Sequence, residues 1–215
     1  MSEKSLGPEK SLGKEQLSLS RTAQREDTRR KLLACARKLF RARGVDQVAM
    51  EDIAQTASFS RATVYLHFAG KPVLLEALLL EDWASQLLLF ERLHKVDFTD
   101  TESIANWVRR IAAGMKIASD SFAIYRAAVG QNASLTVLHQ QHIAALAQEL
   151  RHACGEDTSQ TCDARVRSLE AELIVAEIEH FATASVLAWN EQDTAKAVLL
   201  VVERLRGFAA RGRSA

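Results

Sequence analysis

Residues 53–75 have the sequence IAQTASFSRATVYLHFAGKPVLL, and this stretch decides the fold class. Its apolar spacing predicts a short helix over about 50–57, a break at 58–60, and a second short helix over about 61–68. Two short helices joined by a three-residue turn form a helix-turn-helix. In that motif the second helix fits the major groove of DNA, while the first helix braces it from behind.

The segments on both sides of this stretch also predict helices. A helix over about 25–43 is indicated by apolar residues at helical spacing, namely Leu32, Leu33, Ala36, Leu39 and Phe40. Gly44 ends it, because glycine adopts the left-handed C-terminal cap without strain. Pro72 fits the first turn of a fourth helix, which we expect to continue to about Leu93.

The rest of the chain keeps the helical period. We expect helices near 101–118, 121–131, 134–153, 163–190 and 193–210, and no stretch alternates long enough to indicate a strand. The sequence therefore predicts an all-α protein, with an N-terminal three-helix DNA-binding domain at 23–72 and a C-terminal helical ligand-binding and dimerisation domain at 73–215. Residues 1–22 repeat the polar pentapeptide EKSLG, and we expect a disordered tail there.

The charge is distributed unevenly along the chain. The net charge is only +1, but residues 21–71 carry 11 Lys and Arg against 5 Asp and Glu. Residues 72–215 carry 14 Lys and Arg against 19 Asp and Glu, so an acidic body follows a basic block. This distribution is typical of a nucleic-acid-binding end on a neutral or acidic platform.

Composition also bounds the expected compartment. The first 20 residues are polar and show no signal-peptide pattern, and no segment is apolar enough for a membrane span. Three cysteines at irregular spacing do not indicate a disulfide framework. We expect a cytoplasmic protein with reduced thiols and no membrane partner.

The second short helix carries most of the candidate DNA-binding residues. Ser60 is expected to be its N-cap, which leaves Arg61, Ala62 and Thr63 at the end that meets base edges. Arg61 suits bidentate pairing with guanine, and the two methyl groups suit contact with thymine. The remaining candidates, expected at phosphates, are Tyr65, His67 and Lys71, the last of them at the N-terminus of the fourth helix.

The same stretch resembles the DNA-binding domain of the tetracycline-repressor (TetR) family. The resemblance covers roughly residues 25–80 and rests on Gly44 and on residues in one register, namely Ile53, Ala54, Ala57, Ser60, Thr63, Val64, Tyr65, His67, Phe68 and Lys71. Several positions depart from the family pattern. Ser58-Phe59 replaces Gly-Val, Ala62 replaces a frequent Gly, Val48-Ala49 replaces hydroxyl residues before the first motif helix, and Pro72 replaces a frequent Glu.

The resemblance implies a homodimer paired through the last two helices, and a small-molecule effector bound among the middle helices. Apolar stripes suited to such pairing, or to a plain core, contain Val166, Leu169, Leu173, Ala176, Ala184 and Leu187, and then Val198, Val201, Val202, Leu205 and Phe208. Candidate effector-binding residues, which also suit an ordinary core, are Trp107, Met115, Phe122, Tyr125, His139, His142 and Phe181.

Two sensing alternatives stay open at this point. His139 and His142 lie three residues apart and could form half of a metal site, although no third ligand is identified, so no metal or cofactor is expected. Cys154 and Cys162 flank a loop and could form a redox disulfide.

The expected function is a ligand-responsive, homodimeric repressor that binds double-stranded DNA at a palindromic operator. An activator of the same fold, or a helical protein-interaction module without a ligand, are the alternatives. An enzyme is not expected, because the sequence contains no nucleophile elbow, phosphate-binding loop or His-Glu-x-x-His motif.

Overall fold

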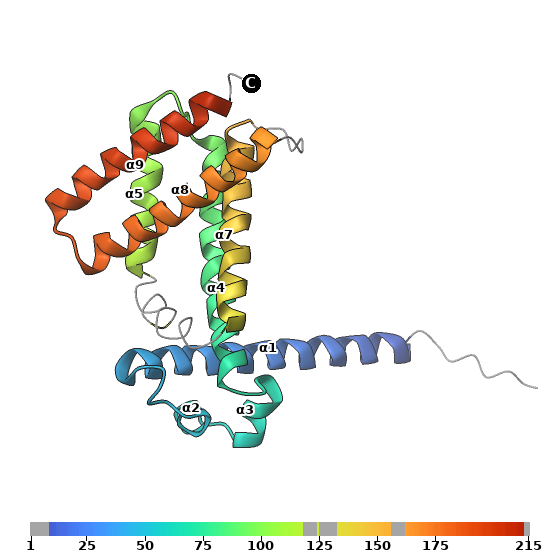
Figure 1. Ribbon diagram of the computed structural model, residues 1–215. Coiled ribbons are helices and arrows are strands. Elements are labelled where there is room, and N and C mark those ends of the chain that lie inside the picture. The colour runs from blue at the N-terminus through green and yellow to red at the C-terminus, as the bar shows by residue number, and fades with distance from the viewer. Residues whose placement is uncertain (1–8, 118–123, 125–132, 156–161, 213–215) are drawn as a thin grey trace, which may run out of the picture. The chain divides into compact units, whose positions relative to one another are not determined.

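The computed structural model describes residues 9–117, 124, 133–155 and 162–212 (Figure 1). Every regular element in these ranges is helical, which confirms the predicted all-α fold. The chain forms two compact units, residues 1–74 (unit 1) and 75–215 (unit 2). None of the described helices is both long and apolar enough to cross a lipid bilayer.

Unit 1 contains three helices, α1 (Glu9–Arg43), α2 (Met50–Thr56) and α3 (Arg61–His67). The sequence predicted a disordered tail to residue 22 and a helix from about residue 25. The first helix instead begins at Glu9. Residues 9–22 contain Glu, Lys, Leu and Gln, which are good helix formers, and no proline. Pro8 directly precedes the helix, and proline is tolerated at a helix start.

The core of unit 1 joins the C-terminal half of α1 to the two short helices. Its buried apolar side chains include Leu32, Leu33, Ala36, Phe40, Val45, Val48, Ile53, Ala54, Val64 and Phe68. Gly44 ends α1 with φ of 81° and donates its N–H to the Phe40 carbonyl at 2.8 Å. The predicted glycine cap is therefore present, and it turns the chain toward α2.

The turn between α2 and α3 is a Schellman motif built without glycine. Phe59 N–H donates to the Ala54 carbonyl at 3.0 Å, and Ser58 N–H donates to the Gln55 carbonyl at 3.2 Å. Ser58 lies at the left-handed position with φ of 57°, where this pattern of bonds favours glycine. The departure from Gly-Val at this turn therefore leaves the turn intact and places backbone strain on Ser58.

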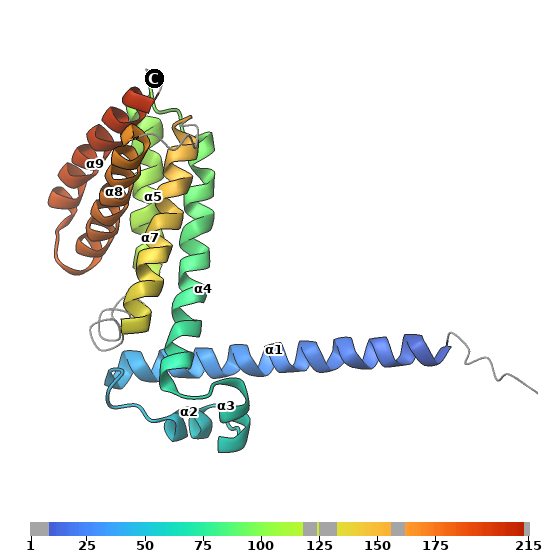
Figure 2. The same cartoon turned by 45° about the vertical axis from the view of Figure 1, so that its right-hand side comes forward.

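Unit 2 is a bundle of longer helices, which Figures 1 and 2 show from two directions. Its elements are α4 (Lys71–Glu91), which begins in the last residues of unit 1, then η1 (Arg92–Lys95), α5 (Thr101–Ile117), α7 (Ala133–Ala153), α8 (Cys162–Leu187) and α9 (Glu191–Gly212). Within it α7 packs on α8, and α5 packs on both α8 and α9. The helix expected over 121–131 lies outside the described residues, apart from residue 124.

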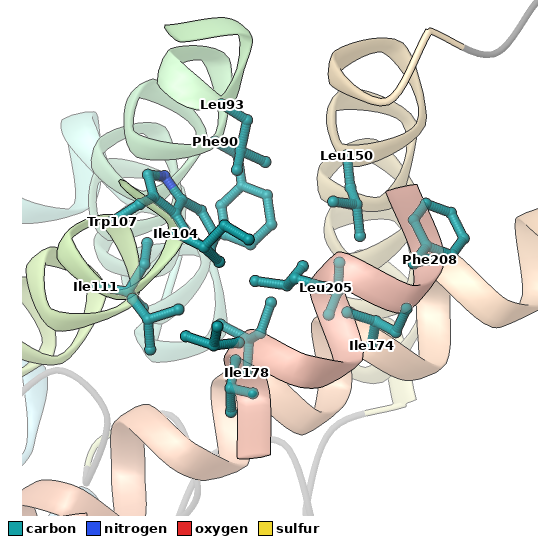
Figure 3. Close-up of a cluster of buried hydrophobic side chains, with 14 of the residues drawn as sticks. Phe90, Leu93, Ile104, Trp107, Ile111, Leu150, Ile174, Ile178, Leu205 and Phe208 are labelled. Carbon is teal, nitrogen blue, oxygen red and sulfur yellow. The ribbon is translucent and has the colours of Figure 1, made fainter. Parts of the chain in front are cut away.

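The core of unit 2 fills the space between these helices. Figure 3 shows how its side chains converge, among them Phe90, Leu93, Ile104, Trp107, Ile111, Leu150, Ile174, Ile178, Leu205 and Phe208. The whole predicted stripe of α9, from Val198 to Phe208, is buried in this core. The stripe of α8 behaves differently, because Val166, Leu169, Leu173 and Leu187 are exposed.

Candidate nucleic-acid interface

Ser60 is the N-cap of α3, where the sequence predicted a cap. Its Oγ accepts the Thr63 N–H at 3.0 Å and lies 2.8 Å from Thr63 Oγ1. Satisfying this amide defines the first turn of the helix. On the opposite side of α3 the buried Val64 anchors the helix to the core, as does Phe68 just after the helix ends.

The side chains opposite this buried side are exposed. Arg61, Ala62, Tyr65 and Leu66 all face solvent, with Tyr65 47% and Leu66 73% exposed, and Thr63 is half-buried. Arg61 forms an ion pair with Glu51 of α2, with its guanidinium nitrogen 2.6 Å from the carboxylate oxygen. This contact links the two motif helices and holds the guanidinium beside the start of α3. The sequence did not predict the pairing with Glu51, and Leu66 was not among its candidates.

Lys71 is anchored to the loop that follows α1. Its ammonium donates to the Val45 carbonyl at 2.9 Å and to the Val48 carbonyl at 3.1 Å. An ammonium has three donors, so one remains for a phosphate. Lys71 therefore has a structural role beside the expected phosphate contact, and the N-terminus of α4 offers backbone amides at the same place.

His67 lies at the C-terminal end of α3, in basic surroundings. Burial and the neighbouring positive charges of Arg25 and Arg29 lower the pKa of His67 below its usual value of 6.5. The guanidinium of Arg29 also lies 4.7 Å from the centre of the Phe68 ring. A neutral imidazole can still donate one N–H, and an approaching phosphate favours the protonated form.

The start of α2 is capped without a hydroxyl residue. The Asp52 carboxylate accepts the Ala49 N–H at 2.8 Å, and its other oxygen lies 3.5 Å from the Arg43 guanidinium. The missing hydroxyl at positions 48–49 is therefore compensated by a carboxylate inside the helix, which also suits the positive end of the helix dipole.

Unit 2 contains an apolar cavity among α4, α5, α7 and α8. Its volume is about 80 Å³. Side chains of Leu89, Phe90, Ile111, Leu146, Ile178 and Ala182 form its walls beside Gly114, and Asp82, Ser85, Gln86 and Glu179 supply polar groups. The cavity has the composition of a small-molecule site, largely apolar with a few polar groups, but its volume in this structure is below the roughly 300–1,000 Å³ of such sites.

The two candidate histidines lie beside this cavity and contact residues that line it. His139 Nε2 lies 3.1 Å from the Glu179 carboxylate, and His142 Nε2 lies 2.7 Å from the Gln86 amide oxygen. His142 also stacks on Trp83, with ring centres 4.8 Å apart. Burial, and to a lesser extent the charge of His139, lowers the pKa of His142 to about 4. Among the described residues no group of three or more His, Cys, Asp or Glu is placed to hold a metal ion.

The other effector candidates are placed elsewhere or not described. Phe181 is buried in the core, and Trp107 packs edge-on against Phe90 and donates its indole N–H to the Leu89 carbonyl at 3.0 Å. Phe122 and Tyr125, and the side chain of Met115, lie outside the described residues. Of the two cysteines that could form a redox disulfide, Cys154 is buried. The side chain of Cys162 is not among those that the structure describes. The cavity-lining residues of α4 were missed, because an apolar helix alone does not indicate which face borders a cavity.

Comparison with known proteins identifies the family of the N-terminal domain. Residues 32–78 match the family model for bacterial regulatory proteins of the tetR family. The chain is 33% identical over 85 residues to the HTH-type transcriptional regulator UidR of Escherichia coli strain K12, over 38% of this chain and 43% of UidR. The match thus spans less than half of that relative's length.

Solved structures extend the similarity of fold to most of the chain. A TetR-family regulator from Mesorhizobium loti superposes with a TM-score of 0.65 at 18% identity, covering 86% of this chain and 96% of that one. The structure of RolR in complex with resorcinol has a TM-score of 0.52 at 22% identity, covering 88% and 96%. Residues 32–78 therefore form a DNA-binding domain of the tetR family of bacterial regulatory proteins, as the resemblance predicted, and the fold of most of the chain is that of TetR-family regulators. The expectation that it is not an enzyme agrees with the regulators it matches.

Proposed function

We propose that the protein is a transcriptional regulator that binds a palindromic DNA operator as a homodimer, represses transcription, and is released by a small-molecule effector. One observation carries the proposal. The N-terminal end of α3 is capped by Ser60 and exposes Arg61 and Ala62 to solvent, within a basic stretch of chain. This is the end of a recognition helix that meets base edges in the major groove.

Electrophoretic mobility shift with the DNA upstream of the protein's own gene tests the proposal. We expect the Arg61→Ala variant to lose about 1–3 kcal/mol of preference for its operator over random DNA, because bidentate contact with one guanine contributes that much. Arg109→Ala is the matched control, since Arg109 is also exposed and paired with a nearby glutamate, Glu102, at 2.7 Å, but lies in unit 2. Failure of the folded dimer to bind any neighbouring promoter at low salt would contradict the proposal.

The exposed face of α8 supports the homodimer. Val166, Leu169 and Leu173 follow one another at intervals of three and four residues, and Leu173 is 64% exposed. Ala176, His180 and Leu187 continue the same row, and all three are exposed. Apart from His180 this row is apolar, and such a row on one helix face is the pattern of a helix–helix seam. Two-fold pairing would bring two recognition helices to the halves of a palindrome.

Analytical ultracentrifugation tests this face directly. We expect Leu173→Glu to convert a dimer into a folded monomer, because two buried carboxylates would face each other across the seam. The control is Leu200→Glu on α9, which is also exposed but lies on another helix. A dimer that persists in the first variant and dissociates in the second would assign the interface to α9 instead.

The apolar cavity of unit 2 supports the effector. A ligand that bound one arrangement of the dimer better than the other would shift the population away from the DNA-binding arrangement. RolR, a protein of similar fold, has been crystallised with resorcinol, which is an example of a small aromatic ligand in this fold. We infer that the cavity beside Gln86 and Glu179 is the effector site, with His139 and His142 holding those two polar groups in position.

A further inference from the structure

Unit 2 contains a second concave site, and Trp107 is one of the residues that line it. It is a cleft of about 420 Å³, lined by residues of α4, η1, the segment after it, and α5. Its lining has Leu89 in common with the apolar cavity and otherwise differs from it in composition. The volume lies within the range of roughly 300–1,000 Å³ that small-molecule sites occupy.

Three cations line this cleft. Arg92 and Lys95 come from η1 and Arg110 comes from α5, and all three are exposed. No carboxylate is present in the lining, and none of these three side chains has an ion pair or hydrogen bond with another described residue. By contrast, the adjacent Arg109 is paired with Glu102 at 2.7 Å. Three uncompensated like charges around one cleft create a positive potential that an anion would relieve.

The polar side chains of the cleft also present donors. Ser103 Oγ accepts the Asp97 N–H at 3.0 Å, which leaves its hydroxyl hydrogen available. Asn106 Oδ1 accepts from the Arg109 guanidinium at 3.1 Å, which leaves its amide N–H₂ available. Neither donor is used in a contact between described residues, so both side chains can donate a hydrogen bond to a ligand.

The remaining wall of the cleft is apolar and held in place. Trp107 is 5% exposed, donates to the Leu89 carbonyl at 3.0 Å, and packs edge-on against Phe90 with ring centres 5.2 Å apart. Val96 lies beside it in the lining. A wall of this kind offers contact area to a carbon skeleton, which an inorganic ion lacks.

We propose that this cleft binds a small organic anion carrying two or more negative charges. Arg92, Lys95 and Arg110 would pair with its carboxylate or phosphate oxygens, Ser103 and Asn106 would donate hydrogen bonds to it, and Trp107 would contact its carbon skeleton. The guanidinium groups are suited to either oxyanion. This inference does not depend on DNA binding or on the apolar cavity, so it can fail while the proposed function holds, and the reverse is also true.

Isothermal titration calorimetry of the full chain with citrate and with glucose 6-phosphate tests the proposal. We expect one saturable site per chain for at least one of the two probes, with affinity that falls as salt is added. The trimethyl ester of citrate, which has the same skeleton without the charges, should not bind. Binding of one probe only would support the site and identify its oxyanion, whereas equal binding of the neutral ester would overturn it.

Two variants separate a built site from general surface charge. The double variant Arg92→Gln, Arg110→Gln should lose about 100-fold in affinity, since one charged contact is worth roughly tenfold. Lys196→Gln removes one exposed charge of unit 2 on α9, outside the lining, and it should change affinity less than twofold. Fluorescence of Trp107, assigned by Trp107→Phe, should change on binding. No binding by the folded wild-type protein, or an equal loss per charge in the Lys196 variant, would overturn the proposal.

Discussion

The candidate DNA-binding residues of unit 1 lie within one short stretch of chain, whereas the cavity of unit 2 is assembled from four helices. In unit 1 the cap of α3 joins residues only three positions apart, Ser60 and Thr63. In unit 2 the bonds beside the cavity join residues 40 and 56 positions apart, namely His139 with Glu179 and His142 with Gln86. A site made from local contacts can be identified from a sequence pattern, and a site made from distant contacts requires the fold.

The largest expected effects test whether the two cores are independent. Phe68 in unit 1 and Phe208 in unit 2 are both 0% exposed. Each Phe→Ala substitution should cost about 3–5 kcal/mol of stability through lost burial and the cavity left behind. We expect hydrogen exchange measured by mass spectrometry to increase mainly in the unit that carries the substitution. Loss of protection throughout the chain in both variants would mean that the two units fold as one.

The next largest expected effect is the pH dependence of the stability of unit 2, which we assign to His142. Because its folded pKa is about 4 and its usual value is 6.5, the unfolded state takes up the proton first as pH falls. The contribution of His142 to the free energy of unfolding of unit 2 should therefore be fully present above pH 6.5. It should be lost as the pH falls toward 4, by about 3 kcal/mol in total. Urea unfolding at several pH values measures this slope.

Two variants show whether His142 is responsible for that slope. His142→Gln should flatten the pH dependence, because the titrating group is gone. His152→Gln changes an exposed histidine of the same helix and should leave the slope as it is. An unchanged slope in the first variant would assign the acid sensitivity to other groups.

Lys71 allows a test of structure against DNA contact within unit 1. Replacing it by alanine removes two bonds from an ammonium to carbonyl oxygens, and we expect a loss of about 1.5–3 kcal/mol in stability. Lys71→Met keeps the apolar stem and isolates the part due to the charge. If the third donor contacts a phosphate, both variants should also weaken binding to all DNA sequences alike and reduce the salt slope by about one. Normal salt dependence in both folded variants would limit Lys71 to its structural role.

The smallest expected effect lies in the turn of the motif. Ser58→Gly relieves the left-handed backbone strain, which costs about 1–2 kcal/mol for an L-residue. The extra conformational entropy that glycine loses on folding opposes this gain by about 0.5–1 kcal/mol. A net gain of about 0.5–1 kcal/mol is expected, visible as a higher Tm of unit 1. Ser58→Ala is the control and should bring no gain. A lower Tm for the glycine variant would show that the serine side chain stabilises the turn.

Sequence reasoning was most successful where one residue type has a single local use. Gly44 was expected to end α1 and does so, and Ser60 was expected to cap α3 and does so. It was least successful where several uses share one pattern. Trp107 was grouped with the other effector candidates, but it lines the second cleft and not the apolar cavity, and Gln86 on α4 was not considered at all. The start of α1 also differed, because helix-forming and disorder-prone compositions overlap in polar segments.

The amino-acid sequence by itself determined that this protein is all-helical and that its helix-turn-helix lies near residues 50–68. It could do so because helical period, caps and breaks depend on residues a few positions apart. Only the tertiary structure decided that the stripe of α9 is buried while that of α8 is exposed except at Ala184, and that Arg61 is held by Glu51. Both stripes are apolar in sequence. They differ in which face the neighbouring helices cover, and this depends on contacts between residues far apart in the chain.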